Sequence, residues 1–238
     1  MYVSDMHTHS IASGHGTSDT IAKMAKAAKA RGMRLLGITD HGPATMGSAR
    51  EAYFKSLTLA PRWRCGIEIL YGTELNILDL NGSLDLPREI LSQLDYAVAS
   101  MHSQNLTHGD ICENTTGYLN VMKNPKVKIL GHIDTPNFPA DIEELVGCAP
   151  EHHVLIELNE ASLAPGGIRT PNPEGSVRIV LAAKKYRTPL LLSSDSHGAA
   201  HVGDFTYCIK LLRALEFPEH LIINNQTERL KSFLKEAL

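Results

Sequence analysis

Seven short apolar segments recur along the chain, and stretches with a helical pattern separate them. The apolar segments are residues 2–6, 34–39, 67–73, 96–100, 127–131, 154–158 and 189–194. Most are continuous apolar runs, which is typical of parallel strands covered on both faces. Helices are predicted over 17–32, 111–123, 140–149, 173–187, 204–215 and 226–237. Alternating strands and helices predict βαβ units and an α/β fold with a parallel sheet.

One segment departs from this alternation. Residues 77–86 alternate apolar and polar side chains around Asn81-Gly82, which predicts a β-hairpin with a two-residue turn after the third strand. We find no internal repeat, low-complexity tract or linker-like change of composition. Because α/β barrels often reach 200–250 residues as one unit, we expect residues 1–238 to form a single catalytic domain.

Composition excludes several classes of protein. The formal net charge is −3 and the pI is about 6.4, so no basic surface is expected to attract nucleic acid or an anionic membrane. No apolar run approaches the ~18 residues that span a bilayer, and the start of the chain lacks the features of a signal peptide. We expect a cytoplasmic protein with buried, reduced thiols. The cysteines are Cys65, Cys112, Cys148 and Cys208.

Ionisable side chains follow six of the seven predicted strands. They are His7, His9 and His15 after the first, and then Asp40, His41, Glu74, His102, His132, Asp195 and His197 after later strands. In barrels of alternating strands and helices, active sites form at this carboxyl end from the βα loops. His7 and His9 also share a face, because side chains two apart in a strand point the same way. The placement predicts one metal site.

The expected donors are imidazoles and carboxylates, without a thiolate. Seven histidines and two carboxylates, Glu74 and Asp195, exceed the three or four ligands of one zinc ion, so at least two cations are implied and three are possible. Zn, Mn and Fe all suit such ligands. We expect divalent zinc, with manganese or iron as alternatives.

The motifs "HTHS", "TDH", "GTE", "MH", "GH" and "SDSH", in this order, resemble the PHP (polymerase and histidinol phosphatase) family. The similarity covers roughly residues 1–215 and is greatest to the YcdX-like branch of small bacterial phosphatases with a trinuclear metal centre. The resemblance implies a distorted (β/α)7 TIM-like barrel, which agrees with the seven apolar segments.

The resemblance also implies how the ligands are shared among three cations. The first would be held by His7, His9, Glu74 and Asp195, the second by Glu74, His102 and His132, and the third by His15, His41 and His197. One departure is visible, because Ile133 and Asp134 follow the strand-five histidine where related phosphatases often have proline. Because of this departure, the resemblance does not identify the substrate.

Clustered cations activate a shared water and bind the oxygens of an in-line displacement. The predicted reaction is therefore hydrolysis of phosphate monoesters of small metabolites by a metal-activated hydroxide, with Glu74 and Asp195 central to the site.

Four further residues are candidates for contacting the substrate. Arg169 after the sixth strand has the fork geometry that binds phosphate oxygens, and an exposed loop arginine is the alternative. Asn159 is interpreted either as a donor to the substrate or as an ordinary loop amide. The general acid is expected to be His108 or Asp134.

The remaining polar residues have weaker assignments. Asp40 is expected either to orient a ligand imidazole or to structure its loop. Ordinary surface or core roles are expected for His152, His153, His201 and His220.

Three alternative functions stay open. Histidinol-phosphate phosphatase belongs to the same family, and a non-catalytic or exonuclease PHP module would act in nucleic-acid metabolism. The amidohydrolase superfamily shares His-x-His on its first strand, but no suitable bridging lysine ends a strand here. A small phosphorylated substrate is the expected partner, and the oligomeric state is not predicted.

Overall fold

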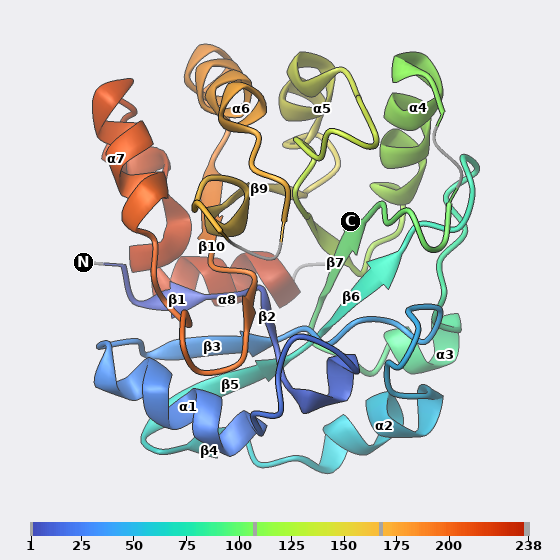
Figure 1. Cartoon of the computed structure of the whole chain (residues 1–238), viewed down its shortest axis with the longest axis vertical. Coiled ribbons are helices and arrows are strands. Elements are labelled where there is room, and N and C mark those ends of the chain that lie inside the picture. The colour runs from blue at the N-terminus through green and yellow to red at the C-terminus, as the bar shows by residue number, and fades with distance from the viewer. Residues whose placement is uncertain (1, 107–108, 167–168, 236–238) are drawn as a thin grey trace.

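The computed structural model describes residues 2–106, 109–166 and 169–235, and it has an α/β fold (Figure 1). All seven predicted strands are present, with ends that differ by at most two residues. They are β1 (Ser4–Asp5), β3 (Leu35–Ile38), β5 (Ile67–Tyr71), β7 (Ala97–Ser100), β8 (Val127–Leu130), β9 (Leu155–Asn159) and β10 (Leu190–Ser193). Short strands that the sequence reasoning missed are β2 (Thr8–His9), β4 (Trp63–Arg64), β6 (Thr73–Asn76) and β11 (Ser196–His197).

The strands form a distorted TIM-like barrel from two main sheets. One has the order β1-β3-β5-β4 and the other β10-β9-β8-β7-β6, and every pair except β4–β5 is parallel. The predicted third strand is divided at Gly72, so that β5 pairs with β3 while β6 pairs with β7. A Cβ on Gly72 would lie 2.8 Å from the carbonyl oxygen of Tyr96, so the chain turns from one sheet into the other where only glycine fits.

Side chains join β1 to β10 on the other side of the barrel. The Asn224 amide donates to the carbonyls of Ser4 at 3.0 Å and Leu192 at 2.7 Å, and its oxygen accepts from the N–H of Leu192. The buried Asp5 carboxylate accepts from the backbone and hydroxyl of Ser194. These bonds replace a strand ladder.

A third, two-stranded sheet lies at the carboxyl end of the barrel. In it β11 pairs with β2 in parallel, with Ser196 opposite Thr8 and His197 opposite His9. This pairing brings together segments that are almost 190 residues apart in the sequence.

The helices surround the strands. In Figure 1, α4 to α7 stand outside β7 to β10, and α1 and α2 lie outside β3 and β5. The longer helices agree with the predictions, and the short α2 and α3 were not predicted. Their bounds are α1 (Ile21–Ala30), α2 (Glu51–Ser56), α3 (Arg88–Leu91), α4 (Ile111–Val121), α5 (Ile142–Cys148), α6 (Pro173–Tyr186), α7 (Thr206–Ala214) and α8 (Thr227–Lys235).

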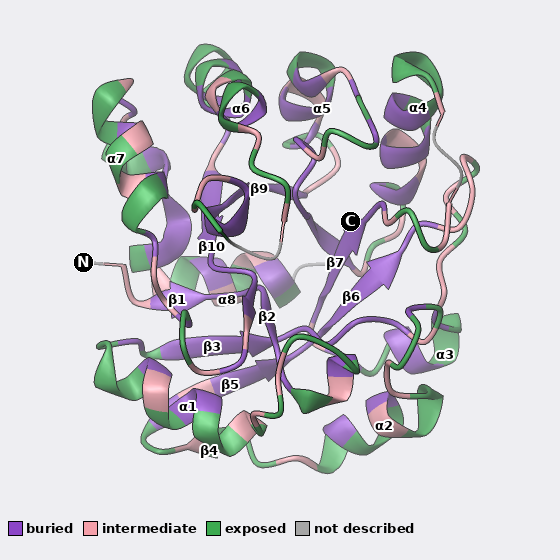
Figure 2. Ribbon diagram, in the orientation of Figure 1, coloured by how far each residue is buried: buried purple, intermediate pink, exposed green. Residues whose placement is uncertain are grey.

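Alternate strand residues enter two separate apolar clusters. Leu36 and Ile156 pack outward against the helices, whereas their neighbours Leu35 and Leu155 point into the barrel. Figure 2 shows that the strands are buried and that the exposed residues lie mainly on the helices and loops around them.

The helix α8 closes the amino end of the barrel. Its Leu230 and Leu234 are buried in the interior cluster, and its Lys231 ammonium donates at 3.0 Å to Glu68, near the start of β5. The interior is therefore a packed core rather than a pore.

The predicted hairpin over 77–86 is wrong in its turn. A single antiparallel bridge joins Ile77 to Leu84. Inside this bridge the Leu78 N–H donates to the Ser83 carbonyl, so four residues, 79–82, lie between Leu78 and Ser83. The Asp79 carboxylate accepts from the backbone N–H groups of residues 81 and 83, and this bonding favours the longer turn.

The prediction of buried thiols holds for one cysteine. Cys208 is buried and Cys148 is partly buried, whereas Cys65 and Cys112 are exposed. Cys65 lies in a left-handed turn beside Gly66 that leads into β5, and Cys112 lies in the first turn of α4. Among the described residues, no helix has both the length and the hydropathy needed to cross a bilayer.

Candidate metal centre

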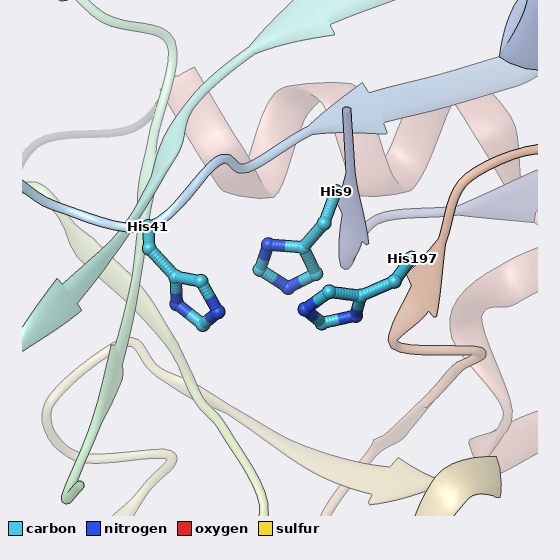
Figure 3. A group of neighbouring side chains, drawn as sticks. All are labelled: His9, His41 and His197. Atoms are coloured by element: carbon cyan, nitrogen blue, oxygen red, sulfur yellow. The ribbon is translucent and has the colours of Figure 1, made fainter. Parts of the chain in front are cut away.

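The predicted ligands converge at the carboxyl end of the barrel. Figure 3 shows His9 from β2, His41 from the segment after β3 and His197 from β11, with their rings directed toward one another. The His9 ring centroid lies 4.3 Å from that of His41 and 4.2 Å from that of His197. His15 extends the group, because its ring stacks 4.8 Å from His41. Four imidazoles thus form one side of the site.

The Glu74 carboxylate lies at the middle of the site and is 1% exposed. It follows the Gly72 turn, so β6 carries it to the junction between the two main sheets. Five imidazoles lie within 3.6 Å of its oxygens. They are His41 at 2.6 Å, His132 at 2.9 Å, His7 and His102 at 3.4 Å, and His9 at 3.6 Å.

Asp195 is the second buried carboxylate of the site. Its Oδ1 lies 3.2 Å from His9 Nε2 and 3.8 Å from His7 Nε2, so both histidines of the first motif face it. Its Oδ2 accepts from the Asn159 amide at 3.1 Å and lies 3.7 Å from the Arg169 guanidinium. Asp195 therefore connects the histidines of the first motif with the loop after β9.

Two residues of the site adopt left-handed backbone conformations. The φ angles are +31° at His132 and +52° at Asp195. Residues other than glycine disfavour this region, and such strain persists where the surrounding structure holds it. At His132 the backbone N–H donates to Glu157 at 2.7 Å, which fixes the turn that directs the imidazole to Glu74.

Hydrogen bonds on Nδ1 orient three of the imidazoles. His7 donates to the buried Glu157 carboxylate at 2.6 Å, and His102 donates to the side-chain oxygen of Asn76 at 2.8 Å. His9 donates at 3.0 Å to the Ser13 hydroxyl, which in turn donates to Asp40 at 2.7 Å. With the hydrogen on Nδ1, each ring presents the Nε2 lone pair to the carboxylates at the centre.

The arrangement shifts the pKa values of both central carboxylates. Burial alone would raise the pKa of Glu74, but the nearby imidazoles, His7 foremost, hold it well below its usual range. Burial likewise opposes the ionised form of Asp195, and its pKa is also held well below the usual range, chiefly by His7 and His9. Both groups are therefore ionised in the folded protein.

The imidazoles differ from one another in their charge. Burial, followed by the neighbouring His41 and His197, holds the pKa of His9 well below its usual range. For His7 the effect of burial is outweighed by Glu157 and Glu74, so its pKa is raised. Cations bind imidazoles in the neutral form, so a cation held by His7 would take the place of the proton that Glu157 and Glu74 favour.

Several buried polar atoms of the site have no hydrogen-bond partner within the described ranges. They are Nε2 of His7, His9 and His197, Nδ1 of His41 and His132, and Oε2 of Glu74. The His41–Glu74 contact of 2.6 Å is not aligned as a hydrogen bond, so both atoms keep lone pairs directed into the site. Buried groups normally have partners, and a group of unpaired donors and acceptors with this chemistry fits bound cations.

The candidate ligand atoms form groups that differ from the three ligand sets implied by the resemblance. Three sets have atoms within 4.8 Å of one another, and they are His7-His9-Asp195, His41-Glu74-His102 and His9-His41-His197. The first lies within the implied first site. In the other two, His41 stands in place of His132, and His9 in place of His15. The shared rings lie close enough that one imidazole can face two positions.

The other candidate residues differ in whether they reach the pocket that contains Glu74. Arg169 reaches the site through Asp195 and lines the same pocket. The Asn159 amide donates to both Glu157 and Asp195, so it positions ligands and has no hydrogen left for a substrate. Asp134 accepts from two serine hydroxyls, does not line the pocket and is not placed to act as general acid. His108 lies outside the described residues.

The orienting role expected for Asp40 is present, but it acts through Ser13 rather than directly. His153 donates through Nε2 to the Phe233 carbonyl at 3.0 Å and stacks on the Phe233 ring, and His220 faces Arg187, both away from the site. His201 is exposed and lines a second cavity beside Asp195.

Sequence reasoning missed three supporting residues. Ser13 and Asn76 are small polar residues without a recognisable motif. Glu157 did carry a signal, because it is a charged residue inside the apolar segment 154–158. A carboxylate in a strand buried on both faces needs a partner, and here its partner is His7.

The comparison with protein families decides the classification. The model of the PHP domain matches residues 5–213. The chain belongs to the PHP family. A probable phosphatase of Clostridium novyi is 40% identical over 235 residues, which cover 98% of this chain and 95% of that protein. A probable phosphatase of Clostridium acetobutylicum is 38% identical over 234 residues, with the same coverage.

A solved PHP-family structure shows the same fold. The histidinol phosphate phosphatase of Lactococcus lactis, in complex with zinc, L-histidinol and phosphate, superposes with a TM-score of 0.59. The match covers 92% of this chain and 94% of that chain at 15% sequence identity. The resemblance recognised in the sequence motifs is thus confirmed for the family and for the barrel.

Proposed function

We propose that this PHP-family phosphatase hydrolyses phosphate monoesters of small metabolites at a multinuclear metal centre. The observation that carries the proposal is the set of unpartnered imidazole and carboxylate atoms around Glu74 and Asp195. Structural polar clusters normally satisfy one another, whereas three groups of candidate ligands here have atoms within 4.8 Å of one another and include most of the unpartnered atoms.

The chain offers places for three divalent cations, for which zinc is our first candidate and manganese or iron are alternatives. We assign the nine ligands proposed from the sequence to this centre, which is supported by the contacts of Glu74 with five imidazoles and by the stacking of His15 on His41. When bound, such cations supply Lewis acidity and an activated water. The zinc in the Lactococcus lactis structure supports the choice of metal at the level of the family.

The protein itself contributes position and charge. Glu74 and Asp195 are held ionised at the centre, and the Nδ1 hydrogen bonds of His7, His9 and His102 fix which nitrogen faces inward. Arg169, with its side chain 16% exposed, lies at the edge and presents N–H donors to phosphate oxygens. Apart from His108, which lies outside the described residues, we assign no general acid.

Metal analysis combined with a substrate panel tests the proposal. Freshly purified protein should contain about three divalent ions per chain, and chelation should abolish hydrolysis of a nitrophenyl phosphate ester, with activity restored by adding metal. Protein with no bound metal, or with activity that survives complete chelation, would contradict the scheme.

The panel also separates the alternative functions. Histidinol phosphate tests the activity named for the Lactococcus lactis neighbour, and single-stranded DNA tests an exonuclease. Hydrolysis of small monoesters in general, without a marked preference for histidinol phosphate and without DNA cleavage, is the expected result.

A further inference from the structure

A second cavity opens beside the metal centre, on the side of the loop that follows β9. It has a volume of about 480 Å³ and lies between this loop, the segment after β10 and the first turn of α7. Asp195 and His197 line both this cavity and the pocket that contains Glu74. The two spaces therefore meet at shared ligand side chains.

The volumes of the two spaces fit different parts of a phosphate ester. The pocket at the metal centre has a volume of about 170 Å³, which is below the ~300–1,000 Å³ typical of sites that enclose a whole small molecule. It has room for a phosphate group near the ligands. The second cavity falls within that range, so the alcohol part of a phosphate ester has a space beside the place where the phosphate would lie.

Histidine apart, the ionised side chains among the described residues that line the second cavity are all acidic. Besides Asp195, its lining includes the carboxylates of Glu160 and Asp204, and the described lining residues include no lysine or arginine. Glu160 is fixed, because its two oxygens accept from the backbone N–H groups of Tyr207 and Cys208, each at 2.8 Å. The positive end of the α7 dipole is thus already matched by a carboxylate and is not offered to an anion.

Asp204 is the carboxylate best placed to meet a ligand. Its Oδ1 accepts from the N–H and the hydroxyl of Thr206, and no described residue donates to Oδ2. His201 and Tyr207 line the cavity near it and add polar groups. The Lys210 ammonium lies 4.9 Å over the Tyr207 ring, and Lys210 does not line the cavity.

We propose that this cavity receives the alcohol part of the substrate and that Asp204 selects against alcohols bearing a second anionic group. The inference rests on the proposed phosphatase function and narrows its substrate class. Uncharged hydroxylated alcohols are accepted, because His201, Tyr207 and Asp204 offer hydrogen-bonding groups. Alcohols with a carboxylate or another phosphate are repelled by Asp204 and Glu160.

A matched pair of esters tests the proposal in the full-length, metal-loaded protein. Glycerol 3-phosphate and 3-phosphoglycerate differ by the oxidation of one CH2OH group to a carboxylate. We expect kcat/KM to favour glycerol 3-phosphate, and Asp204→Asn to lower the preference roughly three- to tenfold, as expected for losing one partly screened like-charge contact. Asparagine keeps an oxygen that can accept from Thr206.

Asp141→Asn is the matched control, since Asp141 caps α5 with the same kind of bond and does not line the cavity. It should leave the preference unchanged. An unaltered preference in Asp204→Asn, with normal hydrolysis of nitrophenyl phosphate, would overturn this inference and leave the phosphatase function standing. Failure of the unmodified protein to hydrolyse nitrophenyl phosphate would overturn both.

A steric variant tests the location independently of charge. Ala164 lies in the wall of the cavity, and Ala164→Phe would fill part of it. We expect kcat/KM for glycerol 3-phosphate to fall about tenfold through KM, as lost ground-state binding requires, while methyl phosphate is hydrolysed at a rate within about twofold of normal. Equal losses for both esters, or no loss for either, would show that the alcohol lies elsewhere.

Discussion

The two ends of the barrel interior are built from the same strands but have opposite chemistry. Along β9 the inward side chains change from Leu155 to Glu157 to Asn159, and along β10 and beyond it they change from Leu191 to Asp195. At the amino end these positions join an apolar cluster that α8 covers. At the carboxyl end they hold buried charges, unpaired imidazole nitrogens and strained backbone.

The difference shows how one strand serves both stability and chemistry. Burial of leucine at the amino end stabilises the fold, each such side chain contributing about 1.5–3 kcal/mol. Burial of unpaired polar atoms at the carboxyl end is unfavourable by about 1–3 kcal/mol for each group in the absence of a ligand. The packed end thus holds the ligands in place before a cation arrives. Four changes test whether the stability provided by the amino end and the metal binding proposed for the carboxyl end can be altered independently.

The largest effect is expected from Glu74→Ala. Because this carboxylate contacts five imidazoles, its loss should remove the metal from two positions and lower kcat/KM by roughly a thousandfold or more. Elemental analysis and a nitrophenyl phosphate assay measure both effects. Glu113→Ala, in the capping box of α4, should change neither, and full activity in Glu74→Ala would refute the assignment.

At the opposite end, Leu230→Ala should act on stability alone. Leu230 is fully buried in the interior cluster, so the change should lower the free energy of unfolding by about 2–4 kcal/mol in urea titrations. Leu181→Ala, at a half-exposed position, should change it by less than about 0.5 kcal/mol. If Leu230→Ala reduced the metal content of the folded protein, the two ends would not be independent.

Acid should lower the free energy of unfolding of the metal-free protein by protonating a histidine at the carboxyl end of the barrel. Burial lowers the pKa of His132 to about 4, below its value of ~6.5 in the unfolded chain, so the unfolded state binds more protons between these values and stability falls as the pH drops. From pH 7 to pH 5 the loss from this group is about 2 kcal/mol. His132→Asn, which tolerates the left-handed backbone, should lack this part of the pH dependence in chelator-treated urea titrations. Identical pH slopes would disprove it.

The fourth change, Glu157→Gln, should weaken metal binding without removing a ligand. An amide has only one oxygen, whereas the carboxylate accepts from His7, His132 and Asn159. Such supporting partners typically change metal affinity by about 10- to 100-fold, which chelator competition can measure. Glu151→Gln, the same change at an exposed position away from the site, is the control and should leave metal affinity unchanged. Unchanged affinity in Glu157→Gln would remove its proposed role.

The sequence predicted the elements that burial dictates. Continuous apolar segments located all seven main strands, because strands covered on both faces have few alternatives. The strands β2 and β11 were missed since they are two residues long and polar, and their pairing depends on the fold as a whole. The division at Gly72 was also missed, because one apolar segment runs through it.

For the site, strand polarity was enough to predict which residues meet. It did not predict how they group, because the ring directions depend on backbone angles at His132 and Asp195 that no sequence pattern shows. The role of Asn159 was also hidden, since its amide could face either a substrate or its neighbours until Glu157 was placed beside it.

The parallel pairing of β2 with β11 has a consequence for biosynthesis. His7 and His9 are synthesised almost 190 residues before Asp195 and His197. Closing so long a loop carries an entropic cost that only the completed barrel offsets. These two pairs of side chains therefore come together only after the strands and helices between them have been made.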